Sequence, residues 1–204
     1  MPVTRSSRTP AAEPTARPST LCGGRSPSGD KLDTLLTTRG ASAEWRLLAD
    51  ALTLAFKGSR EVSPNHPAAE VMCQFNARRL ARELAGLGRW NDGCYTRTTL
   101  LEGEGFVVLL LCWSPGVMSP VHAHSDATTR VQSSCFMRVL EGELSETLYD
   151  NSAILGEDKV LAAAGAERTL EAGDYTYIDD NKGLHKVGNA SGTTGAMSLH
   201  ICKL

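Results

Sequence analysis

The chain has 204 residues, 41% of them hydrophobic, and a formal net charge of −2. This length suits one domain with a real hydrophobic core and is short for two domains. The nearly balanced charge gives no basic footprint for nucleic acid, and no apolar run approaches the roughly 20 residues of a membrane helix. We therefore expect one domain that binds neither nucleic acid nor membranes.

The first 38 residues are rich in Pro, Ser, Thr, Ala and Arg. Such a composition buries too little apolar surface to offset the entropy of ordering the chain, so we expect a disordered or targeting tail. Its arginines and hydroxyl side chains also fit an organelle transit peptide, whereas its prolines disfavour the amphipathic helix of a mitochondrial signal. A solvated tail on a cytoplasmic protein is the preferred interpretation.

Two amphipathic helices are expected between positions 42 and 88. In the first, over 42–57, Trp45, Leu48 and Leu52 fall on one stripe, and Gly58 is placed to end the helix. The second runs from Pro67, which suits a first helical turn, to position 87. Two such helices ahead of a β-region predict a helical layer on the outside of a barrel.

Short strand-like runs separated by Gly, Asn and Asp turns fill positions 92–204. The expected strands lie at 94–100, 106–113, 120–124, 135–142, 143–150, 167–173, 174–179, 185–189 and 197–202. There is no alternation of strands with helices, which argues against a parallel sheet. The pattern predicts a mainly β fold, a small jelly-roll barrel with the N-terminal helices packed outside.

Several charged and sulfur-bearing residues have plain structural explanations. Glu141, Glu143 and Glu146 are interpreted as a solvated strand face. The six cysteines contain no CxxC pair. A reducing compartment is therefore the preferred setting, with most of the thiols buried as small hydrophobic side chains.

Three histidines stand out as candidate metal ligands. His122 and His124 are two positions apart, so an extended chain would direct both imidazoles to one side, and His185 lies in a later strand. Imidazole suits Fe, Zn, Cu and Ni alike, so these ligands alone do not name the ion. An isolated pair of this kind is also common as a surface or structural feature.

The surroundings of these histidines resemble the two cupin motifs. Gly116 is followed by five residues and then His122, Cys135 is followed by six residues and then Gly142, and Gly173 opens the second motif. The segments CYTRTTL, CFMRVLEGELSETLYD, GLHKVGN and SLH occur in the order seen in the cysteine dioxygenase family. The resemblance implies a cysteine dioxygenase-like cupin domain over 39–204.

The resemblance also implies a cofactor and a reaction. In this family three histidines, here His122, His124 and His185, hold a non-haem Fe(II) without a carboxylate ligand. The implied reaction oxidises L-cysteine with O2 to cysteine sulfinic acid, a step of cysteine catabolism and taurine biosynthesis. The small-molecule substrates L-cysteine and O2 are the expected partners, and the protein is expected to be a monomer.

Four further site residues follow from the same motifs. Arg97, in the segment CYTRTTL, matches the family's carboxylate-binding arginine. An arginine suits this role because a guanidinium pairs with a carboxylate through two hydrogen bonds. Tyr95 has the same strand phase and matches a substrate-side hydroxyl. Cys135 matches the cysteine that forms a thioether bond with a tyrosine beside the iron, and His200 matches the residue that orients that tyrosine.

The chain departs from the family pattern in two places. Cys202 occupies the position of the crosslinked tyrosine, shortly before the sequence ends. About six surplus residues lie between His124 and Cys135, so we expect an insertion over 125–134. Misjudged exon boundaries would account for both departures.

Three alternatives to a cysteine dioxygenase stay open. One is a thiol dioxygenase for a substrate without an amine, such as 3-mercaptopropionate, although Arg97 favours cysteine. Another is a catalytically impaired cupin that binds metal, which the missing tyrosine favours. The third is a zinc or manganese cupin with isomerase chemistry, for which the sequence offers no positive signal.

Overall fold

A computed structural model describes residues 42–59, 61–124, 133–149, 164–179 and 181–203. The helices are α2 (Ala43–Phe56), α3 (Pro67–Gln74) and α4 (Ala77–Leu84). The strands are β1 (Tyr95–Gly103), β2 (Phe106–Trp113), β3 (Ser134–Glu141), β4 (Glu143–Tyr149), β5 (Ala164–Glu171), β6 (Tyr175–Asp179), β7 (Leu184–Gly188) and β8 (Ala196–Lys203). The predicted tail and most of the predicted insertion lie outside the described residues.

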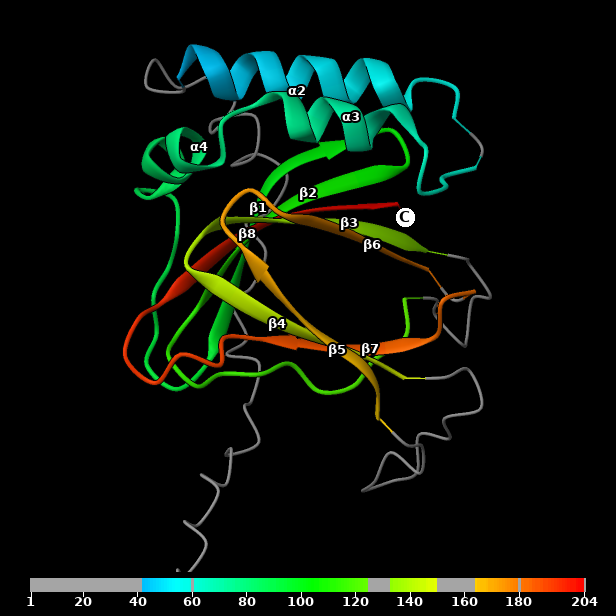
Figure 1. Cartoon of the computed structure of the whole chain (residues 1–204). Coiled ribbons are helices and arrows are strands. Elements are labelled where there is room, and N and C mark those ends of the chain that lie inside the picture. The colour runs from blue at the N-terminus through cyan, green and yellow to red at the C-terminus, as the bar shows by residue number, and fades with distance from the viewer. Residues whose placement is uncertain (1–41, 60, 125–132, 150–163, 180, 204) are drawn as a thin grey trace, which may run out of the picture.

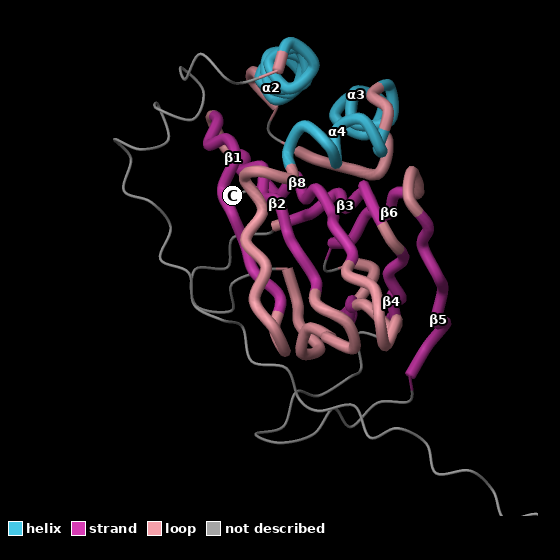
Figure 2. The backbone as a smooth tube through the Cα atoms, turned by 90° about the vertical axis from the view of Figure 1, so that its left-hand side faces the viewer, coloured by secondary structure: helices cyan, strands magenta, loops and turns pink. Residues whose placement is uncertain are grey.

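The strands form two antiparallel sheets. One sheet has the order β1-β2-β8-β3-β6 and the other has the order β5-β4-β7. β3 runs into β4 through a tight turn at Gly142, whose φ of 74° is a conformation that glycine adopts without strain. Figures 1 and 2 show the three helices together on the outer side of the five-stranded sheet. This arrangement confirms the predicted mainly β, jelly-roll fold with outer helices.

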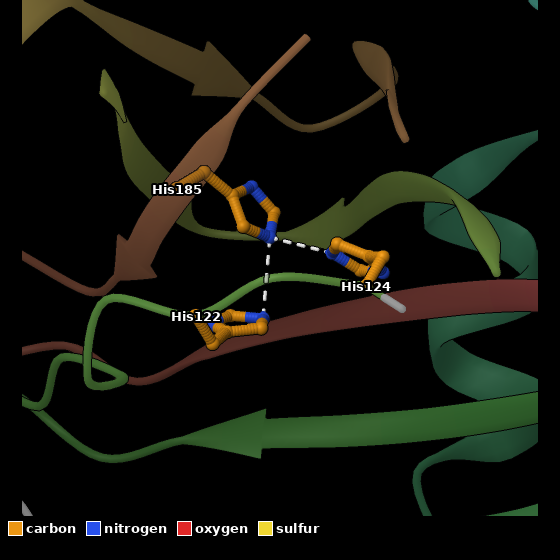
Figure 3. Close-up of side chains that lie close together, drawn as sticks. All are labelled: His122, His124 and His185. Carbon is orange, nitrogen blue, oxygen red and sulfur yellow. Dashed lines mark hydrogen bonds between the residues drawn. The ribbon is translucent and has the colours of Figure 1, made fainter. Parts of the chain in front are cut away.

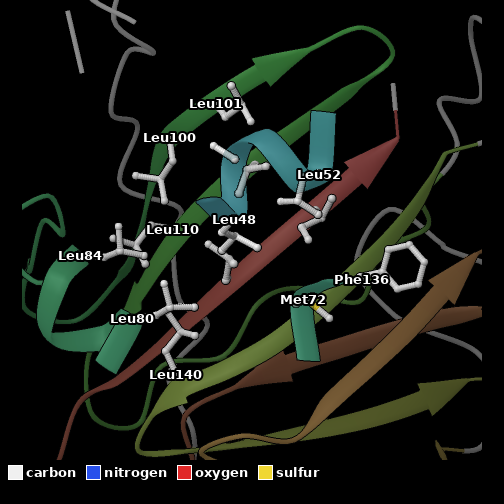
Figure 4. Packing of buried hydrophobic residues seen from close by; sticks show 14 of the residues in the cluster. Leu48, Leu52, Met72, Leu80, Leu84, Leu100, Leu101, Leu110, Phe136 and Leu140 are labelled. Atoms are coloured by element: carbon white, nitrogen blue, oxygen red, sulfur yellow. The ribbon is translucent and has the colours of Figure 1, made fainter. Parts of the chain in front are cut away.

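The core has two layers because alternate residues of a strand point to opposite faces. The outer layer joins the helices to the five-stranded sheet, with Leu48, Met72 and Leu80 against Leu110 and Phe136 (Figure 4). The inner layer lies between the two sheets and includes the intervening strand residues, such as Leu111, Met137 and Val139. Since β2 is covered on both faces, its sequence FVVLLLCW is an unbroken apolar run.

Strand β8 shows how this alternation places polar groups inside the barrel. Leu199 and Ile201 belong to the outer layer beneath the helices. The intervening side chains Ser198, His200 and Cys202 therefore point to the interior, where His200 and Cys202 line a cavity. The fold thus directs a polar row of the C-terminal strand into the barrel.

The predicted first helix is confirmed, whereas the single helix over 67–87 is wrong. Phe75 is extended, with φ −91° and ψ 144°, and ends α3; α4 begins after Asn76, whose Oδ1 accepts a hydrogen bond from Arg79 N at 3.0 Å. Asn is a preferred N-cap residue. Buried Arg138 donates to the carbonyl oxygens of Met72 and Phe75, which pairs the groups that the break exposes.

The predicted strand over 120–124 is also wrong. The segment makes isolated bridges, in which Met118 pairs with Gly188 and His122 pairs with His185, and it does not form a continuous ladder. Pro120 contributes no backbone N–H to a ladder. Among the helices that the structure describes, none is both long and apolar enough to cross a membrane.

Candidate metal centre

The backbone brings His122 and His185 together. His122 N donates to His185 O at 2.9 Å, and His185 N donates to His122 O at 3.1 Å. This reciprocal pair sets the two residues directly opposite each other although 63 positions separate them. His124 follows two positions later and reaches the same point. Backbone hydrogen bonds from Ser119 N to Val187 O and from Asn189 N to Val117 O also join this loop to β7, so isolated bridges rather than a continuous strand position the loop histidines.

The three imidazoles converge through their Nε2 atoms (Figure 3). His185 Nε2 lies 2.9 Å from His124 Nε2 and 3.2 Å from His122 Nε2. One ligand atom from each residue lies within 4.8 Å of the others. Two nitrogens bonded to one metal ion at about 2.1 Å would lie roughly 3.0–3.4 Å apart, so this spacing fits a shared ion.

The hydrogen bonds behind the rings fix which nitrogen carries the proton. His185 Nδ1 lies 2.8 Å from Glu146 Oε1, and His122 Nδ1 lies 3.0 Å from the carbonyl oxygen of Pro120. A carbonyl oxygen and an ionised carboxylate only accept, so both Nδ1 atoms carry the hydrogen. Two Nε2 lone pairs therefore face each other at 3.2 Å, an arrangement that a shared cation would stabilise.

Electrostatics keep the loop histidines neutral, which is the form that binds metal. Burial, followed by the charge of His185, lowers the pKa of His122 to about 4. The same two effects, together with the charge of His122, lower the pKa of His124 to about 3. At neutral pH both rings are uncharged, and no proton must leave before an ion binds.

Glu146 contacts the histidine cluster, and the prediction that it lies on a solvated strand face is wrong. Its side chain is 0% exposed rather than part of a solvated face. Oε1 accepts from His185, while Oε2 accepts from Arg168 Nε at 2.8 Å and from Thr176 Oγ1 at 3.1 Å. Burial alone would raise the pKa of Glu146, but the hydrogen bonds from His185 and Arg168 lower it overall. A signal was present, because Glu146 shares its strand phase with apolar Leu144.

A cavity of about 220 Å³ opens beside the three histidines. It is smaller than the 300–1,000 Å³ typical of drug-sized ligands and therefore suits a small molecule. Its lining contains six of the seven predicted site residues, namely Arg97, His122, His124, Cys135, His185 and His200. The barrel thus brings together side chains from β1, β3, β7, β8 and the loop before β3.

Tyr95, the seventh predicted residue, lies beside the cavity rather than in its lining. Its ring stacks on Trp113, with centroids 4.6 Å apart, and is only 2% exposed. Arg97 Nη2 donates to the Tyr95 hydroxyl at 3.5 Å, and the guanidinium carbon lies 5.5 Å from the ring centroid. Tyr95 is therefore placed to hold the cavity-facing guanidinium.

The expectation that most of the cysteines are thiols buried as small hydrophobic side chains is wrong for Cys135 and Cys202, which line the cavity. Cys135 and Cys202 form a disulfide, with Cα atoms 4.1 Å apart. They face each other in the register of β3 and β8, so alternation points both sulfurs to the interior. Cys202, at the position of the expected tyrosine, is therefore bonded to the very residue that the resemblance pairs with that tyrosine.

His200 contacts Ser198 of its own strand and Cys135 of the neighbouring strand β3. Its Nε2 lies 2.9 Å from Ser198 Oγ, which accepts from Trp113 Nε1 at 2.8 Å, and its Nδ1 lies 3.8 Å from Cys135 Sγ. Burial, followed by the charge of Arg97, lowers the pKa of His200 well below its usual value. A neutral imidazole therefore faces the disulfide in the cavity wall.

Two antiparallel sheets closed around three converging imidazoles define a small β-barrel with a candidate metal site. A sequence model of the family described as cysteine dioxygenase type I matches residues 66–203. The chain belongs to this cysteine dioxygenase family.

Individual relatives agree with this assignment. The chain is 39% identical over 120 residues to cysteine dioxygenase type 1 from Rattus norvegicus, covering 58% of this chain and 56% of the relative. It is 39% identical over 111 residues to the Danio rerio protein of that name, covering 52% and 50%. The chain thus spans about half the length of these curated relatives.

Among solved structures, the chain is similar to a protein with a double-stranded β-helix domain from Klebsiella pneumoniae. The match has a TM-score of 0.42 and 18% identity and covers 59% of this chain and 85% of that chain.

Proposed function

We propose that the chain is a non-haem Fe(II) thiol dioxygenase that oxidises L-cysteine with O2 to cysteine sulfinic acid. The observation that carries the proposal is one small cavity lined by three convergent imidazoles and by the guanidinium of Arg97. A metal-binding group and a carboxylate-binding group in one cavity suit an amino acid whose side chain bears a metal-binding thiol. Membership of the cysteine dioxygenase family supports the same substrate class.

The reaction balances without a further reductant. Both atoms of O2 are added to the thiol sulfur, so the sulfur loses four electrons and dioxygen gains four. The chemistry that Fe(II) supplies when bound is a position for the thiolate and an electron relay for dioxygen, which zinc lacks because it has no redox states. His122, His124 and His185 would hold the ion.

The other residues of the cavity bind and orient the substrate. Arg97 would hold the carboxylate of the amino acid through two charge-assisted hydrogen bonds, and Tyr95 would keep the guanidinium in place. Apolar side chains such as Leu111, Met137 and Val187 line the rest of the cavity. They exclude water and lower the local dielectric constant, which strengthens the ionic contact at Arg97.

A specific observation favours a second candidate, a metal-binding cupin with impaired oxygen chemistry. Cys202 replaces the tyrosine that the family resemblance implies and is bonded to Cys135, so no phenol can be crosslinked there. Such a protein would bind metal, and also thiols, without turnover. A dioxygenase for 3-mercaptopropionate would differ from the first proposal in its substrate and would need no site for an amine.

The deciding experiment measures oxygen uptake by the purified, Fe(II)-loaded chain with L-cysteine and with 3-mercaptopropionate, with sulfinate detected by mass spectrometry. Uptake with cysteine that is lost in His124→Ala is the expected result. We expect Arg97→Gln to raise KM for cysteine about tenfold or more, since hydrogen bonds between charged groups contribute roughly 1.5–3 kcal/mol. Arg46→Ala, on the exposed face of α2, is the matched control and should leave KM unchanged.

Other outcomes separate the candidates. Iron binding without oxygen uptake from either thiol would support the impaired cupin. Uptake with 3-mercaptopropionate in clear preference to cysteine would replace the proposed substrate. A chain that binds no iron would remove the basis of all three.

A further inference from the structure

A disulfide occupies the cavity wall, where a small thiol would encounter it. Cys135 and Cys202 belong to β3 and β8, and both line the cavity that holds the three histidines. The two cysteines of the disulfide differ in exposure, since Cys135 is 2% exposed whereas Cys202 is only partly buried. Cys202 is therefore the more accessible half of the disulfide, and access is one of the factors that decide which sulfur a thiolate attacks.

The neighbouring hydrogen bonds also distinguish the two sulfurs. Trp113 Nε1 can only donate, so Ser198 Oγ accepts its hydrogen, and the single hydroxyl hydrogen of Ser198 is left to point at His200 Nε2. A neutral His200 then carries its proton on Nδ1, which faces Cys135 Sγ at 3.8 Å. An N–H directed at this sulfur stabilises a thiolate there, which makes Cys135 the better leaving group.

From these observations we propose that Cys202 is a reversible modification site for small thiols, with Cys135 as its leaving and resolving partner. In the first step a thiolate RS⁻ attacks Cys202 Sγ. The bond between the two cysteine sulfurs breaks, and its electron pair leaves on Cys135 Sγ, facing His200. In the second step another RS⁻ attacks the RS sulfur of the adduct and releases Cys202 as a thiolate.

The two steps balance as disulfide plus two RSH giving two protein thiols plus RSSR. RSH is oxidised and the protein disulfide is reduced, so no further oxidant or reductant takes part. The inference rests on the proposed function only in that the cavity admits a small thiol. The thiol class that would be oxidised at the metal would therefore also set the redox state of the cavity wall.

The test uses the full chain purified without reductant and kept free of oxygen, so that dioxygenase turnover cannot consume the thiol. L-Cysteine is added for set times, the reaction is quenched with acid, and free thiols are alkylated before peptide mass spectrometry. We expect a transient cysteine adduct on Cys202, followed by alkylation of both Cys135 and Cys202. Exposed Cys73, a free thiol, should be alkylated at every time point and verifies the labelling.

Variants test the direction of the exchange and the part played by His200. Cys135→Ser treated with cystine should keep a stable cysteine adduct on Cys202, whereas Cys202→Ser should give none on Cys135. His200→Leu should slow reduction about tenfold because the donor to Cys135 is lost. His200→Asn, whose side-chain amide can donate to Cys135, should recover part of the rate, which a merely structural role for His200 would not predict.

Three results would overturn the inference: an adduct on Cys135 instead of Cys202, a disulfide that excess cysteine leaves intact, or two free thiols at the start. Failure of the proposed dioxygenase is distinguishable from these results. Exchange at Cys202 without oxygen uptake in the separate assay would retain the modification site and reject the enzyme. Oxygen uptake while the disulfide persists would retain the dioxygenase and reject the modification site.

Discussion

The most informative single change is Glu146→Gln. Glutamine keeps the shape of the side chain but offers one oxygen where the carboxylate has two. If its oxygen accepts from His185, its NH2 group meets the donors of Arg168, and if it flips, the NH2 group meets His185 Nδ1. The second orientation moves the His185 proton to Nε2, where it blocks metal binding. Both orientations are therefore worse than the native one.

The expected magnitude follows from these contacts. Loss of a hydrogen-bond partner behind a metal-bound histidine typically costs 10–100-fold in metal affinity, or about 1.4–2.8 kcal/mol. Without metal the variant also loses a hydrogen bond between charged groups, which contributes roughly 1.5–3 kcal/mol. Water can replace part of the lost contact, because 46% of the Arg168 side chain is exposed. We therefore expect the free energy of unfolding to fall by ~1–2 kcal/mol.

Metal affinity can be measured by competition with a chromophoric chelator, with Co²⁺ or Zn²⁺ as oxygen-stable probes of imidazole sites. Urea denaturation in the presence of EDTA gives the free energy of unfolding without metal. Glu143→Gln is the matched control, because Glu143 lies on the same strand but is exposed. Metal affinity within twofold of wild type in Glu146→Gln, or an equal loss in Glu143→Gln, would refute the reasoning.

Further predictions concern the stability of the fold. Burial, followed by the charge of Lys203, lowers the pKa of His66, whose Nδ1 accepts from Ala68 N at 3.2 Å. The unfolded chain therefore takes up a proton first, and the free energy of unfolding should fall as the pH drops below about 6.5. In urea denaturation at pH 7.5 and 5.5, His66→Asn should reduce this dependence because Asn caps the helix without titrating; an unchanged dependence would contradict the assignment. Arg138→Met should lower the free energy of unfolding by ~1–3 kcal/mol because it leaves carbonyl oxygens at the end of α3 unpaired, and a stability equal to wild type in urea would exclude that role. Leu80→Ala should cost ~2–5 kcal/mol in the same assay, whereas Leu54→Ala, at a side chain 73% exposed, should cost little, and equal losses would contradict the packing argument.

Local sequence was sufficient for most of the elements. The apolar stripe ending at Gly58 predicted α2, and the run FVVLLLCW predicted β2, because hydrophobic periodicity acts over a few residues. The break at Asn76 was readable from its capping side chain but was outweighed by the continuous apolar pattern on both sides. Antiparallel pairing followed from short strands joined by turns.

The candidate metal ligands could likewise be predicted from the sequence. The spacing of His122 and His124 and the later position of His185 indicated that the three could share an ion. Their actual meeting depends on the paired backbone hydrogen bonds between His122 and His185, which no local pattern specifies. The buried setting of Glu146 and the bonding of Cys135 to Cys202 depend in the same way on which strands become neighbours. Propensity and periodicity act between residues close in sequence, whereas convergence of ligands, burial of a charge and pairing of distant cysteines arise only when packing of the sheets brings separate strands together.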